Sequence, residues 1–578
     1  MHRLIQSLVA RLPLGFRVLY RQFLLRVVDL EALSIEADVE RFLGQFAGVL
    51  ILISLISALG AFFSTIAPPT TPEGWLALAW HMEQSAVATM MLVVGLLTVV
   101  SWDSTFPDRR DVMVLSPLPV APRTILLAKV CASGALVCVA IAALNCASGF
   151  AWPLILGTHF AGLPGFARFC VAWWLTVVGA SAFLYCSVLT VQGFSALLLP
   201  RRTFLLFSAI LQLAAFGLFL GVYFIEPSFL SPAAFMAAKG SWWLACTPSY
   251  WFFALFNQVS GNLPADLAWL AWRGWIGLGV AVTGAAASLL LCYLRTMKKT
   301  VEEPDLVPGT HGWACTPRFG GSLQTAIVLF AFRSLVRSRQ HRVVLAFYFS
   351  VAFALAIALL RHELSAPAPL PITPEFIVPT ILMMTFSVIG LRNVFPLPIS
   401  LTANWVLRTT QLCPPEKYIA ATRRTQLIFA VLPVWIVSAF LSLSYRPWHQ
   451  VAEHLVVLGL LGFAFAEVSL IGFHKVPFTC SYLPGKSNIQ LTFWAFVFVL
   501  LILGVSFAPF EQSVLGKPVQ YAELIAVLGA AAFGLWAFNH HRAKSAVLYF
   551  EEIPEEVITT LKLAYAPPNR NQGDTQDA

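Results

Sequence analysis

Residues 44–66 of this 578-residue chain read GQFAGVLILISLISALGAFFSTI and contain no charged side chain. A transmembrane helix needs about 20 mainly apolar residues, because the hydrocarbon core of a bilayer is about 30 Å thick. A helix satisfies its own backbone hydrogen bonds in lipid, whereas an open loop or sheet edge does not. The stretch is therefore predicted to cross a membrane as an α-helix.

Eleven similar apolar stretches follow along the chain. They lie at 79–101, 131–155, 169–193, 203–226, 271–294, 343–361, 376–396, 425–445, 452–473, 489–508 and 519–539. The composition agrees, since 58% of the residues are hydrophobic and only 11% are charged, against about 25% charged residues in soluble proteins. We predict an all-α integral membrane protein with about twelve transmembrane helices.

The basic residues set the predicted orientation. With the N-terminus in the cytoplasm, 31 of the 37 Lys and Arg residues fall in cytoplasmic segments, as expected because Lys and Arg are enriched in cytoplasmic loops. Both termini are then cytoplasmic. No cleavable signal sequence precedes the first span, so we expect a bacterial cytoplasmic (inner) membrane. The net charge of +9 is explained by these loops, with the lipid bilayer and not nucleic acid as partner.

The longest cytoplasmic connection divides the spans into two sets of six. We expect a cytoplasmic amphipathic connecting segment at 1–43, a first six-span half at 44–294, a cytoplasmic linker with a second amphipathic segment at 295–342, a second six-span half at 343–539 and a cytoplasmic tail at 540–578. Because six is even, both halves enter from the same side and are parallel repeats. The amphipathic stretches themselves, at 13–30 and 323–342, are expected to lie in the membrane interface.

The segment between the second and third spans, residues 108–129, reads DRRDVMVLSPLPVAPRTILLAK. Pro119 and Pro122 precede a helix that is predicted to start at Arg123, because proline is tolerated only in the first helical turn. Lys129 is expected near the headgroups. We predict a short, rigid helical segment that projects into the cytoplasm.

A second segment of this kind, NWVLRTTQLCPPEKYIAATRR at 404–424, lies between the eighth and ninth spans. There Pro415, Glu416 and Lys417 occupy the start of the predicted helix. The two segments take the same place in their halves, although few residues are identical between them.

The first segment resembles the permeases of type-two ATP-binding-cassette (ABC) exporters. The resemblance is carried by the pattern L-x-x-L-P-V that leads into the third span, here Leu115, Leu118, Pro119, Val120, Pro122, Ile125 and Lys129. It implies an amphipathic connecting helix, six spans per half, and a cytoplasmic coupling helix that contacts an ATPase. The coupling residues would be Pro119, Pro122, Arg123 and Lys129, with Pro415, Glu416 and Lys417 in the second half. The second segment departs from the pattern, because it has no L-P-V.

The chain offers no nucleotide site of its own. Its one G-K-S, at Gly485 to Ser487, has Cys480 where a phosphate-binding loop needs glycine. We therefore expect a permease and not an enzyme, with no cofactor bound by this chain. ATP would be used by a separate ABC ATPase subunit, in two copies per chain.

Few ionisable side chains fall within the predicted spans. Glu83, with its neighbour Gln84, and Glu467 are the polar candidates in the membrane, where such groups are costly and usually functional. Glu83 is expected near the outer end of its span, where it could reach water. So little buried charge favours transport that is driven by an external ATPase.

Two other interpretations stay open. Asp108-Arg109-Arg110 is similar to part of the loop motif of major-facilitator carriers, which would be driven by an ion gradient. A membrane enzyme is the less favoured alternative. His449 and Glu453 are four residues apart beside His454, which could bind a metal, although exposure at a helix start explains them as well.

Overall fold

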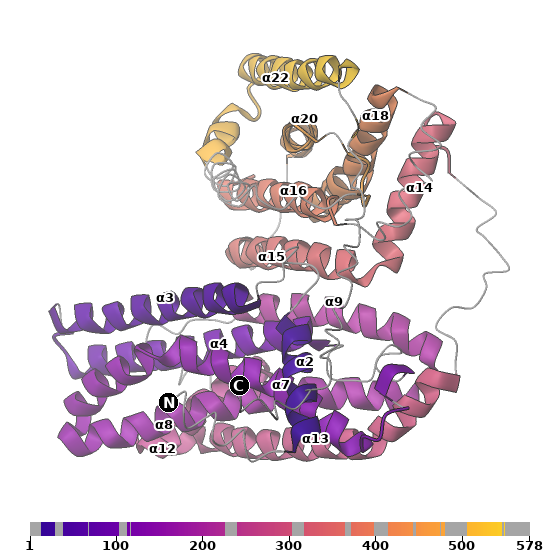
Figure 1. The fold of residues 1–578 in the computed structure, drawn as a ribbon. Coiled ribbons are helices and arrows are strands. Elements are labelled where there is room, and N and C mark those ends of the chain that lie inside the picture. The colour runs from indigo at the N-terminus through magenta and orange to yellow at the C-terminus, as the bar shows by residue number, and fades with distance from the viewer. Residues whose placement is uncertain are drawn as a thin grey trace, which may run out of the picture.

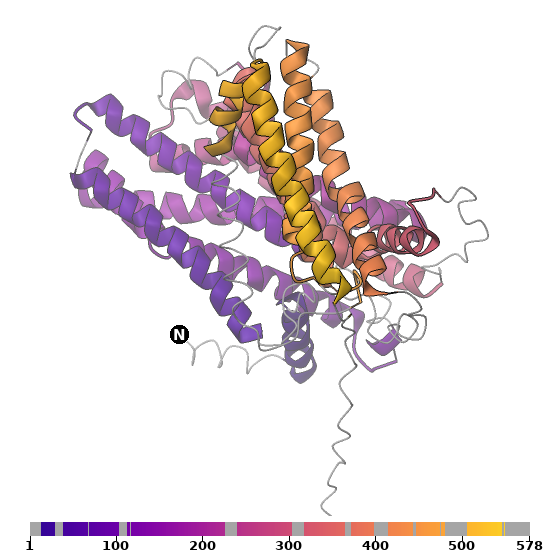
Figure 2. The same ribbon diagram turned by 90° about the horizontal axis from the view of Figure 1, so that it is seen from above.

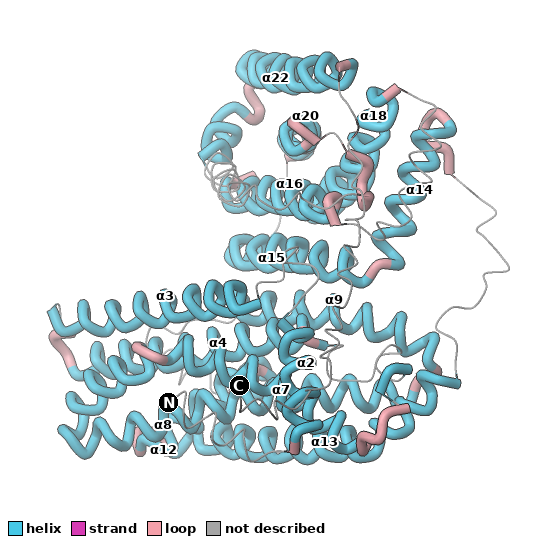
Figure 3. The backbone as a smooth tube through the Cα atoms, viewed as in Figure 1, coloured by secondary structure: helices cyan, strands magenta, loops and turns pink. Residues whose placement is uncertain are grey.

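A computed structural model describes most of the chain. The residues that it describes are 13–28, 39–66, 69–102, 113–115, 117–225, 240–302, 317–364, 372–397, 414–442, 447–473, 475–479, 506–545 and 548. Within these ranges every regular element is a helix (Figure 3).

The first part of the chain contains six long helices. They are α3 (Val39–Ile66), α4 (Pro72–Val100), α7 (Pro122–Asn145), α8 (Ser148–Leu198), α9 (Arg201–Ile225) and α13 (Ala268–Glu302). Shorter elements accompany them: α2 (Leu14–Val28), α11 (Trp242–Cys246), α12 (Pro248–Ser260) and η1 (Ala265–Leu267).

The described residues of the later part also form helices. Its elements are α14 (Ser322–Arg337), α15 (Arg339–Leu364), α16 (Pro374–Val394), α18 (Pro415–Gln426), η3 (Leu427–Val431), α19 (Leu432–Leu441), α20 (Trp448–Ser469) and α22 (Pro518–Lys544). Residues 506–514 form a further short helix before α22.

Nine helical segments in the described residues are long and apolar enough to cross a bilayer. Their number confirms the prediction of an all-α, multi-pass membrane protein. Two more of the predicted spans, 203–226 and 343–361, coincide with α9 and α15, whose apolar stretches are shorter, at 210–224 and 344–360. The predicted span at 489–508 lies almost wholly outside the described residues.

The third and fourth spans differ from their predicted bounds. The third was expected at 131–155, but α7 begins at Pro122 and ends at Asn145. The chain folds back within α8 near Gly162, whose φ of +63° favours glycine. A Cβ on Gly157 would lie 2.8 Å from the carbonyl oxygen of Gly165, a closeness that a straight helix would not give. The predicted loop at 156–168 is therefore mostly helical.

The long helices form two stacked groups. Figure 1 shows α15 between the group of α16, α18, α20 and α22 and the group that contains α3, α4, α7, α8, α9 and α13. In the view turned by 90°, the orange and yellow helices of the later group lie over the purple helices of the earlier one (Figure 2). The groups join where α15 packs along α9. Val99, Phe216 and Ala346 form a buried cluster at this seam.

One span contains a π-helical turn. The elements α18, η3 and α19 follow one another without a break from Pro415 to Leu441, and the π turn covers Leu427–Val431. Pro433 lies two residues after its end. Proline has no N–H for the carbonyl of Phe429 four residues earlier, and its ring would clash with that carbonyl in an α-helix. The wider π turn accommodates the proline.

Candidate functional site

From Pro122 onward, the first predicted coupling segment is the start of the third span, α7. Ala121 caps α7 with an extended backbone, and Pro122 is its first residue, where the missing N–H of proline costs no hydrogen bond. Pro119, Pro122 and Arg123 are exposed. A force on these residues therefore acts directly on a membrane-spanning helix.

Lys129 is buried beneath α2. Its side chain is only 2% exposed, and its Nζ lies 5.1 Å from the ring centroid of Phe23 in α2. This distance is within the range of a cation–π contact. Lys129 therefore joins the amphipathic helix to the third span, and its charge is not presented on the surface.

The predicted amphipathic segment at 13–30 forms α2, which runs steeply across the long helices (Figure 1). Phe23 is buried against Ile125, Ala128 and Ala132 of α7. Four further side chains of α2 pack beside this cluster, namely Phe16, Leu19, Tyr20 and Leu24. The apolar face of α2 thus covers the first turns of α7.

The second coupling segment has the same construction. Pro414 caps α18 with an extended backbone, and Pro415 is the first helical residue. Lys417 is exposed, whereas a Glu416 carboxylate oxygen lies 3.5 Å from Nδ1 of His540 in α22. The helix again continues directly into a predicted span.

The second amphipathic segment, predicted at 323–342, forms α14 and ends at Arg337, where α15 follows after one residue. Ile327 of α14 is buried with Tyr418 and Ala421 of α18. An amphipathic helix therefore covers the start of a proline-initiated span twice in this chain, although the two sequences share few residues.

Glu467, at the end of α20, contacts residues of two neighbouring helices. It is 1% exposed, and its Oε1 lies 2.5 Å from Nε of Arg423 in α18, an ion pair without the alignment of a hydrogen bond. Nδ2 of Asn539 in α22 donates to both the Glu467 carbonyl and Oε2, at 2.8 Å each. The carboxylate thus holds α18, α20 and α22 together, and the space beside it, about 10 Å³, has room for about one water.

Glu83 is buried in α4 and does not reach water as expected. Its side chain is 3% exposed, and Nδ2 of Asn257 in α12 donates to its Oε2 at 2.9 Å. The neighbouring Gln84 is also buried, at 7%. The carboxylate therefore fixes the short helix α12 to the second span.

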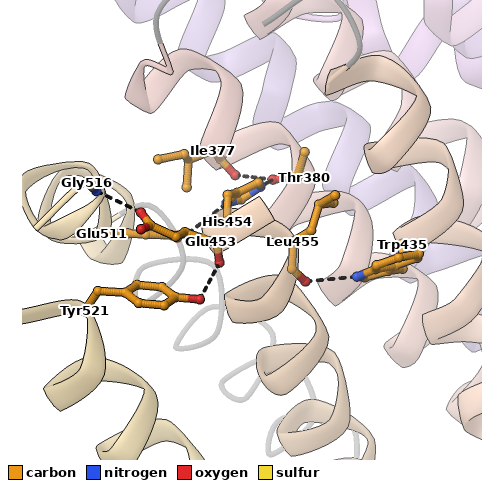
Figure 4. A network of polar contacts seen from close by, with 9 residues as sticks. All are labelled: Ile377, Thr380, Trp435, Glu453, His454, Leu455, Glu511, Gly516 and Tyr521. Atoms are coloured by element: carbon orange, nitrogen blue, oxygen red, sulfur yellow. Dashed lines mark hydrogen bonds and ion pairs between the residues drawn. The ribbon is translucent and has the colours of Figure 1, made fainter. Parts of the chain in front are cut away.

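A second buried polar site lies in the later helices (Figure 4). Nδ1 of His454 in α20 lies 2.7 Å from Oε1 of Glu511, and both side chains are 0% exposed. Thr380 Oγ1 of α16 lies 3.0 Å from His454 Nε2 and donates its own proton to the carbonyl of Ile377. Because the Thr380 hydroxyl donates to Ile377, Nε2 of His454 is the donor toward Thr380, and Nδ1 is the nitrogen that faces Glu511.

Glu511 carries no signal of this role in the sequence, because residue 511 follows a predicted span and falls in a predicted outer loop. Its place on the short helix 506–514 corresponds to that of Asn257 on α12. Each of these short helices precedes the last span of its group, and each is held to a long helix through a buried carboxylate.

The grouping of His449, Glu453 and His454 does not persist in the structure. His454 points inward to Glu511, while Glu453 Oε2 accepts a hydrogen bond from the backbone N–H of Gly516 at 2.7 Å (Figure 4). Among the described residues, no three His, Cys, Asp or Glu side chains lie close enough to hold a metal ion.

Asp108-Arg109-Arg110 and the G-K-S at Gly485 to Ser487 lie outside the described residues. No family model, no curated protein and no solved structure matches this chain.

Proposed function

We propose that the chain is the permease of an ATP-driven exporter of the type-two ABC kind. In this proposal it has twelve spans in two parallel halves and lies in a bacterial inner membrane with both termini cytoplasmic. It binds no cofactor itself. A separate ATPase subunit, present in two copies, uses the ATP.

The observation that carries the proposal is the repeated coupling construction. In each part of the chain a segment with a proline at the first helical position and an exposed basic residue, Arg123 or Lys417, runs directly into a spanning helix, and an amphipathic helix covers its first turns. Two such ends suit a partner that binds in two copies, since each copy can move one span as a rigid body.

In the second segment the structure also offers a route for such movement. Glu416 pairs with His540, and Arg423 pairs with Glu467, which in turn accepts from Asn539. Displacement of α18 would therefore carry α20 and α22 with it, because breaking a buried ion pair costs about 3–5 kcal/mol.

The test is purification of the tagged full chain in mild detergent, with mass spectrometry of its partners and an ATPase assay. We expect about two ATPase subunits per chain. In the double variant Arg123→Glu, Lys417→Glu, the amount of ATPase subunit that co-purifies should fall at least tenfold. Two reversed interface charges together should weaken the binding free energy by more than ~1.4 kcal/mol.

Lys544→Glu is the matched control. Lys544 is also basic and exposed, and we place it on the same side, but it lies in neither coupling segment, so its reversal should leave the ATPase bound. A chain that purifies alone and shows no ATPase activity would overturn the proposal.

A secondary carrier is the alternative that one observation favours. His454 and Glu511 form a fully buried pair of ionisable side chains, and ion-coupled carriers use such intramembrane groups. This function predicts transport without an ATPase that collapses with the proton gradient and is lost in Glu511→Gln. A polytopic membrane enzyme has no comparable support among the described residues.

A further inference from the structure

An apolar groove opens at the seam between the two groups of helices. Its volume is about 370 Å³, and it lies between α9 and the later helices α15, α16 and α19. Leu213, Phe349, Phe353, Met383 and Val437 contribute to its apolar walls, and Ser350 contributes its one polar side chain. This volume falls within the range of small-molecule sites, about 300–1,000 Å³.

Gly217 of α9 keeps part of the groove open. A Cβ at this position would meet only one atom within 4 Å, the Ser350 hydroxyl at 3.8 Å. A larger side chain at residue 217 would therefore extend into the groove without forcing the backbones apart.

The position of the groove along α15 gives its depth in the bilayer. Arg342 precedes the apolar stretch 344–360, which places it at the level of the headgroups. Phe349 and Phe353 follow it by two and three helical turns, or about 10 and 16 Å. One leaflet of hydrocarbon is about 15 Å deep, so the groove extends to the middle of the bilayer.

Arg342 lies on the same face of α15 as the groove, because positions 7 and 11 residues apart repeat on one face of a helix. Ala346, between them on this face, packs against Val99 and Phe216 at the seam. Nε of Arg342 is buried, and it has no hydrogen-bond partner among the residues that the structure describes. Because the Arg342 side chain as a whole is partly exposed, the seam presents a cation at the headgroup level and an apolar groove deeper in the same leaflet.

We propose that the groove holds one acyl chain of an anionic phospholipid, with the lipid phosphate at Arg342. The lipid belongs to the leaflet at the amino ends of α9 and α15. Because the groove is lined by both groups of helices, the acyl chain fills the space between them. The lipid then stays bound as part of the folded protein. This inference does not depend on the proposed function.

The test uses the full chain in nanodiscs with spin-labelled phosphatidylglycerol or phosphatidylcholine, where electron spin resonance measures the immobilised lipid. We expect the wild type to hold phosphatidylglycerol about fivefold more strongly, the effect of one basic residue near the membrane surface. Arg342→Gln should make the two lipids equal. Gly217→Leu should remove the most strongly immobilised component for both lipids.

Two matched variants serve as controls. Arg333 is an exposed arginine of α14, and Arg333→Gln should keep the lipid preference. Gly221→Leu places the same side chain one turn along α9, where a Cβ meets no atom within 4 Å, and should keep the immobilised component.

Three results would overturn the proposal. Equal binding of the two lipids by the wild type would exclude recognition of the phosphate. Retention of the immobilised component in Gly217→Leu would show that the acyl chain does not bind in this groove. Native mass spectrometry of the purified protein could recover a bound amphiphile other than a phospholipid. That result would indicate that the groove binds a transported substrate.

Discussion

At the scale of single residues, the buried His454–Glu511 pair makes a sharp prediction. His454→Leu or Glu511→Leu leaves the other group without its partner in an apolar surrounding, and each should lower the free energy of unfolding by about 3–5 kcal/mol. The double replacement should cost less than the sum of the two, because no uncompensated polar group then remains. Unfolding in a detergent titration measures all four proteins. Strictly additive costs would show that the two side chains are not coupled.

His341 predicts a pH dependence. It is fully buried next to Phe478, and Nε2 lies 2.8 Å from the Leu397 carbonyl oxygen. Burial lowers the pKa of His341 from its ordinary value, an effect that the hydrogen bond to Leu397 partly offsets. The unfolded chain therefore takes up a proton first as the pH falls.

The stability that neutral His341 contributes is complete above the ordinary histidine pKa of about 6.5 and is lost as the pH falls toward the lower, folded-state pKa. His341→Gln should flatten the decline of the melting temperature between about pH 6.5 and pH 5. His541→Gln, at an exposed histidine, should not change it. Equal slopes for wild type and His341→Gln would contradict the assignment.

The pairing of single residues is also least predictable from the sequence. Glu83 and Glu467 are recognisable as polar groups within spans, and both are buried and accept hydrogen bonds from other helices. Their partners, Asn257 and Asn539, and the Glu511 site are not recognisable in this way. These pairings join residues between 57 and 174 positions apart, and no local pattern encodes such a distance.

At the scale of elements, the packing of α20 can be tested with two glycines. A Cβ on Gly462 would lie 2.7 Å from Val431 Cγ1 and 2.9 Å from Met384 Sδ, whereas one on Gly459 would lie no closer than 3.7 Å to any neighbour. Gly462→Ala should therefore destabilise the protein by about 1–3 kcal/mol through overpacking. Gly459→Ala should stabilise it by up to about 1 kcal/mol, the helix preference of alanine. Unfolding titrations compare the two, and a neutral Gly462→Ala would contradict the close approach.

Hydropathy predicted the existence of the described spans well, because a long apolar stretch has few alternatives to a helix in lipid. Their ends were less predictable. The prolines indicated a helix start near residue 123, but the span was placed from 131 because Arg123 and Lys129 interrupt the apolar run. Lys129 is in fact covered by α2, a contact that hydropathy along one helix does not reveal.

At the scale of the whole molecule, the proposed orientation can be tested with single cysteines in a background without the native ones. Arg123→Cys and Lys417→Cys should react with an impermeant maleimide only after the cells are permeabilised. Trp242→Cys, at a residue 77% exposed, and Lys517→Cys should react in intact cells. This outcome follows from the enrichment of Lys and Arg on the cytoplasmic side. Labelling of residue 123 in intact cells would reverse the topology.

The sequence indicated two similar parts, but it could not show how they meet. The seam depends on Phe216 and Ala346, which are ordinary apolar residues of α9 and α15 and carry no mark of their role. The groove beside them arises only when four helices come together. Features that depend on the meeting of distant surfaces need the structure.

The π turn at Leu427–Val431 has a mechanical consequence. A π turn holds one residue more than an α turn, and one residue corresponds to about 100° of rotation about the helix axis. The position of the extra residue is therefore not fixed: the π turn can shift along the span when backbone hydrogen bonds change partners one at a time. Each step would rotate part of the helix about its axis, so a rotation of α18 against α19 would first have to break the contacts of Glu416 with His540 and of Arg423 with Glu467.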